Sequence, residues 1–345
     1  MTPTPAPCTP LPSDAGFPRL VADIGGTNAR FGWVAAAGEP VSHVRKLAVP
    51  EFAVPADAAR AYLEQLAAAM GTRAVPRHAA VAVATAVVDD RVAFTNSHWA
   101  FSRQALQRDL ALDSLLVLND FEALALALPW LGPAQLRTHG AAPGGPGARA
   151  VIGPGTGLGV AGVVPTRHGW QALPGEGGHA TLAAGDDFES DLLRCVRRQY
   201  EHVSAERLLS GIGLPVLHAA VAEVLGQPVA APWSAEQVMA AGLARSDAAS
   251  DRTLDVFCSL LGSFAGNVAL VLGARGGVYI GGGIVPRMAE RFFASPFRDR
   301  FEAKGRFAAY LRAVPTALIT DTLVALTGAA AAIDAEVGTG VPRPR

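Results

Sequence analysis

The chain alternates between short apolar runs typical of covered strands and longer segments whose apolar residues recur at helical spacing. The first run, residues 20–34 (LVADIGGTNARFGWV), predicts a strand, a Gly-Gly-Thr turn and a second strand. In the rest of the first half, strands are expected at residues 41–49, 78–86 and 115–118, and helices at 56–70, 102–110 and 121–128. Such alternation predicts an α/β protein with helices packed on a sheet.

A Gly- and Pro-rich loop at residues 140–149 precedes a second unit that opens on the same plan. Residues 150–164 (AVIGPGTGLGVAGVV) predict strand, turn and strand, with Gly155-Thr156-Gly157 where the first hairpin has Gly25-Gly26-Thr27. Two such hairpins suggest an ancient duplication with two phosphate cradles, and chance similarity of Gly-rich hairpins is the alternative. The elements expected next are a loop at 173–179, helices at 187–200, 204–211, 214–225, 235–244, 251–272, 285–293 and 323–333, and strands at 277–280 and 317–319.

Composition narrows the class of protein. The 345 residues indicate two domains, and because half are apolar and 17% are charged, a sizeable core can be buried. The formal net charge of -1 argues against nucleic acid or an anionic membrane as the main partner. Cys8, Cys195 and Cys258 form no metal-binding or disulfide pattern, which favours a reducing cytoplasm. We expect no membrane span, and a disordered Pro-rich tail at residues 1–18.

The turn of the first hairpin has the chemistry of a phosphate cradle. Gly25 and Gly26 have no Cβ, so the turn can reach positive φ and let a ligand approach the backbone. Thr27 and the turn amides are donors suited to an anion, and the carboxylate of Asp23 is suited to a bound Mg²⁺, directly or through water. The alternative is a tight hairpin without a ligand.

Several common catalytic motifs are absent from the sequence. GPGTGLG lacks the Lys-Ser/Thr that completes a P-loop, and DFE at 120–122 with no HRD loop excludes a protein kinase. The absence of HExxH and GxSxG argues against a zincin and an α/β-hydrolase. The three glycines at 281–283 lack GxGxxG spacing, so dinucleotide binding is only weakly indicated.

Isolated polar residues on predicted loops complete the candidate site. They are Asn96, Asn119, Asp120, Glu176, His179 and Glu206. Carboxylates, amides and an imidazole suit a polyhydroxyl ligand, because each sugar hydroxyl both donates and accepts. Asp120 follows a predicted buried strand, where open α/β sheets bind ligands, and is the best candidate to accept a hydroxyl proton during phosphoryl transfer.

Four of these polar residues also have a structural interpretation. Asp120 suits a helix cap, Asn119 a turn, His179 a satisfied loop histidine, and Glu206 a partner for Ser204 or Arg207.

The sequence resembles bacterial glucokinase, in the branch of the actin-like ATPase superfamily of sugar kinases that lacks the zinc-binding cysteine motif. The resemblance covers residues 20–330. It rests on seven segments in order: DIGGTNAR (23–30), TNSHWAFS (95–102), NDFEALALALP (119–129), IGPGTGLG (152–159), LPGEGGH (173–179), HVSAERLLSG (202–211) and YIGGGI (279–284).

The resemblance implies an α/β, two-domain actin-like ATPase (ribonuclease H-like) fold with an interdomain cleft. The small domain would contain residues 19–130 and 319–338, and the large domain residues 131–318. The implied reaction is phosphorylation of D-glucose at its 6-hydroxyl, at the entry to glycolysis, with ATP as co-substrate and Mg²⁺ as cofactor. A cytoplasmic location and a homodimer are also implied, with no nucleic acid or membrane partner.

The same resemblance implies a role for each candidate residue. Asp120 would be the catalytic base. Glucose would be bound by Asn96, Asn119, Asp120, Glu176, His179 and Glu206. ATP would be bound by Ala22, Asp23, Ile24, Gly25, Gly26, Thr27, Thr156, Gly157, Gly281, Gly282, Gly283 and Ile284, and Asp23 would reach Mg²⁺ through water.

Two other functions stay open at this point. A kinase for another hexose or another phosphoryl donor, such as polyphosphate or ADP, would share these motifs, and a substrate panel separates it. A non-catalytic sugar sensor on the same scaffold predicts glucose binding without turnover. The carboxylate at Asp120 disfavours the sensor.

Overall fold

The chain groups into two compact units in the computed structural model, which describes residues 16–94, 97–227, 229 and 231–337. Unit 1 comprises the chain up to Ala123 together with the segment from Leu323 onward, and unit 2 runs from Leu124 to Thr322. Both units are α/β, as predicted. The domain boundaries that the resemblance implied stay a prediction.

Unit 1 is built on a five-stranded sheet in the order β3-β2-β1-β4-β7, in which β1, β4 and β7 are parallel and β2 is antiparallel to its neighbours. These strands are β1 (Arg19–Ile24), β2 (Asn28–Val34), β3 (Ser42–Ala48), β4 (His78–Val83) and β7 (Ser114–Asn119), and β5 (Arg91–Ala93) pairs with β6 (Ala100–Ser102) in a separate hairpin. The helices are α1 (Pro55–Met70), α2 (Arg103–Asp109) and α11 (Val324–Val337), and α3 (Asp120–Ala127) begins directly after β7.

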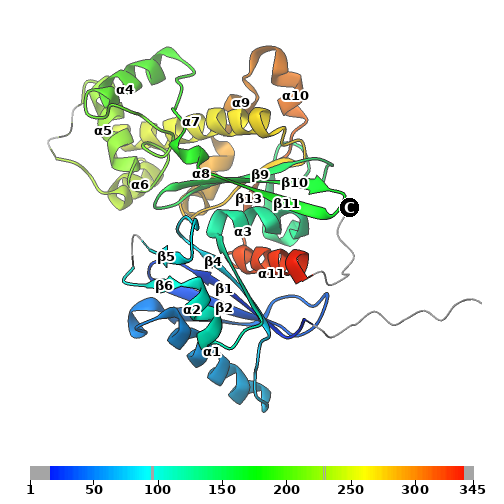
Figure 1. Cartoon of the computed structure of the whole chain (residues 1–345). Helices are drawn as coiled ribbons and strands as arrows, with labels where there is room; N and C mark the ends of the chain where they lie inside the picture. The colour runs from blue at the N-terminus through cyan, green and yellow to red at the C-terminus, as the bar shows by residue number, and fades with distance from the viewer. Residues whose placement is uncertain (1–15, 95–96, 228, 230, 338–345) are drawn as a thin grey trace, which may run out of the picture. The chain divides into compact units, whose positions relative to one another are not determined.

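Side chains alternate along each strand of the unit 1 sheet, so neighbouring residues face opposite sides. Both sides are covered by other elements. Leu20 and Ala22 of β1 belong to the same core cluster as Tyr62 of α1. Val21, which lies between them, packs with Ile333 of α11. Figure 1 shows α1 and α11 on the two sides of this sheet.

Unit 2 contains a six-stranded sheet in the order β11-β10-β9-β12-β13-β8. Its strands are β8 (Leu136–His139), β9 (Arg149–Pro154), β10 (Leu158–Thr166), β11 (Gly169–Gly175), β12 (Gly277–Ile280) and β13 (Thr316–Ile319). Its helices are α4 (Asp187–Arg197), α5 (Leu214–Val224), α6 (Ala235–Ala244), α7 (Ala248–Leu272), α8 (Ala289–Ala294), α9 (Phe297–Glu302) and α10 (Ala308–Arg312).

The two sheets repeat one plan. In each, an antiparallel hairpin (β1-β2 or β9-β10) continues into a third antiparallel strand (β3 or β11). The first strand of each hairpin pairs in parallel with a later strand (β4 or β12), which pairs in parallel with another (β7 or β13). The predicted repetition of the hairpins is confirmed, and the carboxyl ends of the parallel strands gather at one edge of each sheet, where α/β proteins bind ligands.

Helix ends follow the capping chemistry of the sequence. Helix α1 has Pro55 at its first position and ends at Gly71, which has a left-handed φ of 67° that only glycine adopts without strain. The N-terminus of α7 is capped by Asp247, whose side chain accepts a hydrogen bond from Ser250 N.

Two predicted elements of unit 2 are wrong in part. Residues 173–175 belong to β11, so the glycine loop expected at 173–179 is reduced to the 3₁₀ turn at Gly177–His179 and its flanks. The short helix expected over 204–211 does not form, and this segment is a series of turns. The amides of Arg207, Leu208 and Leu209 bond within the segment, whereas those of Ala205, Glu206 and Gly211 bond to other loops.

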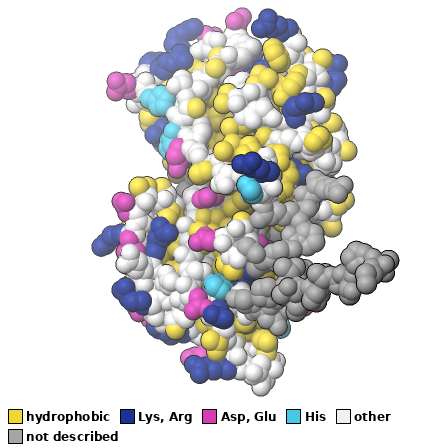
Figure 2. All heavy atoms as spheres, turned by 45° about the vertical axis from the view of Figure 1, so that its right-hand side comes forward, with side chains coloured by type: hydrophobic (Ala, Val, Ile, Leu, Met, Phe, Trp, Pro, Cys, Tyr) yellow, Lys and Arg dark blue, Asp and Glu magenta, His cyan; other side chains and the backbone are white. Residues whose placement is uncertain are grey.

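Helix α7 is long and apolar enough to cross a membrane by length and composition, but 67% of its most apolar window is buried. Phe257 and Leu261 of this helix belong to the central core of unit 2, so its apolar character is explained by packing. On the face drawn in Figure 2, acidic and basic side chains are interspersed, in keeping with a formal net charge of -1.

Candidate active site

The turn between β1 and β2 is held by backbone hydrogen bonds at both ends. Gly25 N donates to Asn28 O at 2.9 Å, and Val49 N donates to Thr27 O at 3.0 Å. The positive φ expected at Gly25 is not found, and a Cβ added there would meet only Asn28 O at 3.6 Å, an ordinary contact. The fold therefore does not require glycine at 25, which leaves open space close to the exposed residue Thr27.

Ala22 and Ile24, both expected to contact ATP, have side chains buried in the core of unit 1. The carbonyl of Ile24 accepts a hydrogen bond from Ala84 N at 3.1 Å. Any contact that these two residues make with a nucleotide is therefore restricted to backbone atoms.

Asp23 lies directly opposite Arg30 in the antiparallel pair of β1 and β2. Its Oδ2 is 3.1 Å from the guanidinium of Arg30. Burial raises the pKa of Asp23 above its ordinary value, and the charge of Arg30 opposes that rise. The sequence analysis missed Arg30 as a partner, although the hairpin register could have indicated it.

Asn119 and Asp120 stand where β7 ends and α3 begins. The side-chain amide of Asn119 donates to Thr85 O at 3.1 Å, and its Oδ1 accepts from Phe121 N at 2.9 Å. Asn119 thus has the turn role that was one of its two interpretations. Oδ1 of Asp120 also accepts from Phe121 N at 2.9 Å, which orients this carboxylate at the first residue of α3.

The pKa of Asp120 lies well above the ordinary value for an aspartate. Burial raises the pKa of Asp120 from 3.8 to about 6, and the negative charge of Asp23 acts in the same direction. Hydrogen bonds from the backbone and from Asn119 oppose the rise. A carboxyl with this pKa is mostly ionised at neutral pH and binds a proton more readily than an ordinary aspartate, as a general base must.

The corresponding turn of unit 2, between β9 and β10, is held by four hydrogen bonds, one of which runs from Ile212 N to Thr156 O at 3.5 Å. Gly155 N donates to Gly157 O at 2.8 Å, and Gly211 N donates to Gly155 O at 2.7 Å. Leu158 N, the first amide of β10, donates to Oε2 of Glu206 at 2.8 Å. Thr156 is exposed at the tip of the turn. The sequence analysis did not predict that the segment around Gly211 supports this turn.

The structure brings together, within unit 2, three of the residues that were predicted to bind the sugar. Nε2 of His179 is 4.0 Å from Oε2 of Glu176, and Nδ1 is 4.0 Å from Oε1 of Glu206. These distances exceed a hydrogen bond. The side chains of Glu176 and His179 are 74% and 61% exposed, so their polar atoms are accessible to a ligand.

Glu206 is not the partner of Ser204 or Arg207, which was its structural interpretation. The hydroxyl of Ser204 accepts from Arg207 N at 3.2 Å, while the Glu206 carboxylate binds the amide of Leu158. This side chain is only 24% exposed, much less than its two neighbours in the cluster.

Residues 281–284 lie against the end of β9, directly before the turn at 155–157. Gly281 N donates to Ile152 O at 2.8 Å, and Ile284 N donates to Pro154 O at 3.1 Å. Gly282 has a φ of +75°, and a Cβ added there would lie 2.3 Å from Pro154 O. Glycine at 282 is therefore required by the fold, and the two glycine loops are neighbours within unit 2.

One predicted ligand, Asn96, lies outside the described residues. In the part of the chain that the structure describes, no group of three or more His, Cys, Asp or Glu side chains is arranged to hold a metal ion. The acidic pair Asp23 and Asp120 nevertheless suits Mg²⁺, which prefers carboxylate oxygens, keeps several waters and takes its remaining ligands from phosphates.

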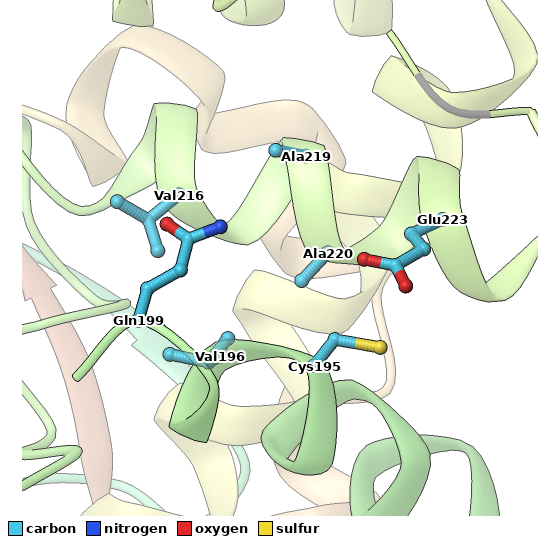
Figure 3. Close-up of a pocket in the computed structure, with 7 residues that line it drawn as sticks. All are labelled: Cys195, Val196, Gln199, Val216, Ala219, Ala220 and Glu223. Carbon is cyan, nitrogen blue, oxygen red and sulfur yellow. The ribbon is translucent and has the colours of Figure 1, made fainter. Parts of the chain in front are cut away.

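A cavity of about 50 Å³ lies elsewhere in unit 2, between α4 and α5. Figure 3 shows its lining side chains, among them Cys195 next to the end of α4 and Glu223 on α5. Ligand pockets usually measure about 300–1,000 Å³. This cavity is therefore too small for a sugar or a nucleotide, and none of the predicted site residues lines it.

The repeated sheet, with a glycine turn in each hairpin and carboxylates at strand ends, defines an α/β protein of the actin-like ATPase class. A family model described as Glucokinase matches residues 20–336. The glucokinase of Chromobacterium violaceum is 49% identical over 316 residues, covering 91% of this chain and 89% of the relative. The glucokinase of Neisseria meningitidis serogroup C is 46% identical over 322 residues, covering 93% and 96%.

A solved structure agrees with these sequence matches. The crystal structure of a glucokinase from an Antarctic psychrotroph is 37% identical, with a TM-score of 0.84, and the match covers 91% of this chain and 98% of that one. The chain belongs to the glucokinase family.

Proposed function

We propose that the chain is an ATP-dependent glucokinase, an ATP:D-glucose 6-phosphotransferase that forms glucose 6-phosphate and ADP. The observation that carries this proposal is Asp120, a half-buried carboxyl with a pKa of about 6 directly after β7, in a chain of the glucokinase family. At pH 7 such a group is about nine-tenths ionised, so it is available to accept the proton of a sugar hydroxyl.

ATP would be bound by the two glycine turns and the loop at 281–284. In unit 1 the proposed contacts come from the turn amides, the hydroxyl of Thr27 and the backbone of Ala22, Ile24 and Gly26. In unit 2 they come from Thr156 and Gly157, with Gly281, Gly282, Gly283 and Ile284 near the nucleoside. Glycine at 25 supports the phosphate assignment, because neither its φ nor its contact with Asn28 O requires glycine for the fold.

Glucose would be recognised by Glu176, His179 and Glu206, whose polar atoms form one cluster in unit 2. Asn119 would contribute through whatever hydrogen-bonding capacity its two backbone bonds leave, since an amide has two donors and two lone pairs. The proposed contact between Asn96 and glucose rests on the family resemblance alone.

Asp23 would hold Mg²⁺ directly or through water, and the charge of Arg30 opposes the rise in its pKa that burial causes. When bound with ATP, Mg²⁺ offsets the charge that develops on the transferring phosphoryl group. We further propose a cytoplasmic location and a homodimer, the commonest assembly of soluble proteins.

A coupled assay of glucose 6-phosphate formation from ATP, Mg²⁺ and glucose tests the proposal directly. Asp120→Asn should lower kcat by about 10²–10⁴, the usual size of general-base help. Glucose should still bind the variant in a calorimetric titration. Asp89→Asn, an exposed carboxylate of unit 1, is the matched control and should keep full activity.

Other outcomes of this assay would redirect the proposal. Near-normal kcat in the Asp120 variant would exclude this residue as the base. Glucose binding without turnover by the unmodified chain would favour the sugar sensor. A panel of hexoses and donors, with polyphosphate and ADP included, would identify a kinase of another substrate, because sites that bind hydroxyls discriminate strongly.

A further inference from the structure

We propose that Glu206 is a positioning residue for the nucleotide turn at residues 155–157, and that it couples this turn to sugar binding through its second carboxylate oxygen. The inference rests on the proposed function and extends it, because the family resemblance gives Glu206 only a contact with glucose. All of the contacts that carry it lie within unit 2.

One oxygen of Glu206 is committed to the turn. Oε2 accepts from Leu158 N at 2.8 Å, and Leu158 directly follows the turn at the start of β10. A Cβ at Gly157 would lie 2.5 Å from the same oxygen. Glycine at 157 is therefore explained by the space that this carboxylate needs, and not by phosphate approach alone.

The backbone around Glu206 joins the turn to the loop that carries the other sugar candidates. Glu206 N donates to Gly178 O at 2.8 Å, and Ala205 N donates to Ala180 O at 2.9 Å. Five residues after Glu206, Gly211 N donates to Gly155 O at 2.7 Å. The segment is thus bonded to both loops, and the Glu206 carboxylate lies between its two attachments.

The second oxygen faces the sugar candidates. Oε1 is 4.0 Å from Nδ1 of His179, which is too far for a hydrogen bond, so its lone pairs are available to a ligand hydroxyl. A sugar bound to Oε1 would hold the whole carboxylate in place, including the oxygen on Leu158 N. The nucleotide would then meet a turn that is already ordered, which produces positive coupling between the two ligands.

Binding of β,γ-methylene ATP, which cannot transfer its terminal phosphoryl group, distinguishes the roles of the two carboxylate oxygens of Glu206. Glu206→Gln keeps an acceptor for Leu158 N, so its nucleotide affinity without glucose should stay within about twofold of the unmodified chain, while glucose affinity falls about tenfold. Glu206→Ala and Glu206→Asp, whose side chains are absent or too short, should lose about tenfold in nucleotide affinity without glucose.

The matched control is His179→Gln, which changes the same cluster but has no bond to the turn. It should weaken glucose binding and leave nucleotide binding without glucose unchanged. In the unmodified chain glucose should tighten nucleotide binding by about fivefold or more, within the usual range of coupling, and the Glu206 variants should lose most of this effect.

Hydrogen exchange at the Leu158 amide gives a readout that does not depend on ligands. Exchange should be faster in the Ala and Asp variants and close to normal in the Gln variant. Unchanged exchange in the Ala and Asp variants, or nucleotide affinity of these variants equal to that of the unmodified chain, would overturn the inference. If the Ala variant does not fold by circular dichroism, the Asp variant decides. If the unmodified chain binds no nucleotide, the proposed function fails instead.

Discussion

Replacing Asp120 with asparagine should remove most turnover and at the same time make the folded chain more stable. Asparagine has the shape of aspartate and keeps an oxygen that accepts from Phe121 N, so packing at the start of α3 is preserved. It removes a negative charge that burial and the neighbouring Asp23 both disfavour. Loss of activity with a gain of stability would mark the residue as functional, since a purely structural role predicts the opposite.

The size of the gain follows from the pKa of Asp120. Folding raises it from 3.8 to about 6. At about 1.36 kcal/mol per pKa unit, the ionised carboxylate lowers the free energy of unfolding by up to about 3 kcal/mol. Because the folded pKa is the higher one, the folded chain binds more protons between pH 3.8 and pH 6, and stability falls as pH rises through this window. The penalty is complete above pH 6 and absent below pH 3.8.

Urea unfolding at a series of pH values from about 4.5 to 8 measures this penalty. The midpoint of Asp120→Asn should exceed that of the unmodified chain at pH 7, and the two should converge toward the acid end. The control Asp89→Asn should stay within about 0.5 kcal/mol of the unmodified chain throughout, as exposed substitutions usually do. A midpoint of Asp120→Asn no higher than that of the unmodified chain at pH 7, or an advantage that does not depend on pH, would refute this reasoning.

Two further predictions concern glycine and cysteine positions. Gly25→Ala should fold with unchanged or slightly higher stability, by about 0.4–1 kcal/mol, and should bind ATP more weakly. Gly282→Ala should lower the melting temperature, because the φ of +75° at this position and the close contact with Pro154 O exclude a Cβ. Equal melting temperatures for the two variants, or full ATP affinity in the first, would contradict this. Burial raises the pKa of the Cys258 thiol to about 12, so an aromatic disulfide reagent should label the half-buried Cys195 in the native chain and leave Cys258 unmodified until unfolding. Peptide mass mapping checks this, and early labelling of Cys258 would refute it.

The elements that the sequence predicts well are those determined by local pattern. The opening hairpin, α1 and β4 follow from apolar runs, helical spacing and glycine turns within a few residues of one another. Strands β5, β6 and β8, and helices α9 and α10, are only three to six residues long, and they lack the continuous apolar run that reveals the equally short β12 and β13.

The short helix predicted over 204–211 shows how tertiary contacts override local preference. The amides of Ala205 and Glu206, which the start of a helix would leave unpaired, donate to Ala180 and Gly178, and the amide of Gly211, which a helix would pair with Arg207, donates to Gly155. None of these partners is close in sequence, so no local pattern could have predicted them.

The candidate site also combines features that the sequence indicates with contacts that it does not. The residue types at Asp120, Glu176 and His179 suit a polyhydroxyl ligand, and the family resemblance was needed to choose that interpretation over a structural one. The bond from Leu158 to Glu206 joins residues 48 positions apart, and no spacing rule predicts it. The pair of Asp23 and Arg30 was within reach, because the register of a hairpin follows from its turn.

The two hairpins have one architecture but hold their carboxylates differently. Asp23 occupies the position before the last residue of β1, and Gly153 occupies that position in β9. Asp23 is paired with a partly exposed Arg30, whose long side chain can move aside when a metal ion or water needs the carboxylate. The second hairpin takes its carboxylate from Glu206, which is fixed to a backbone amide and cannot leave without disturbing the turn. If the hairpins arose by duplication, the first now has an exchangeable carboxylate, as the proposed Mg²⁺ site needs, and the second has a fixed one, as the proposed coupling through Glu206 needs.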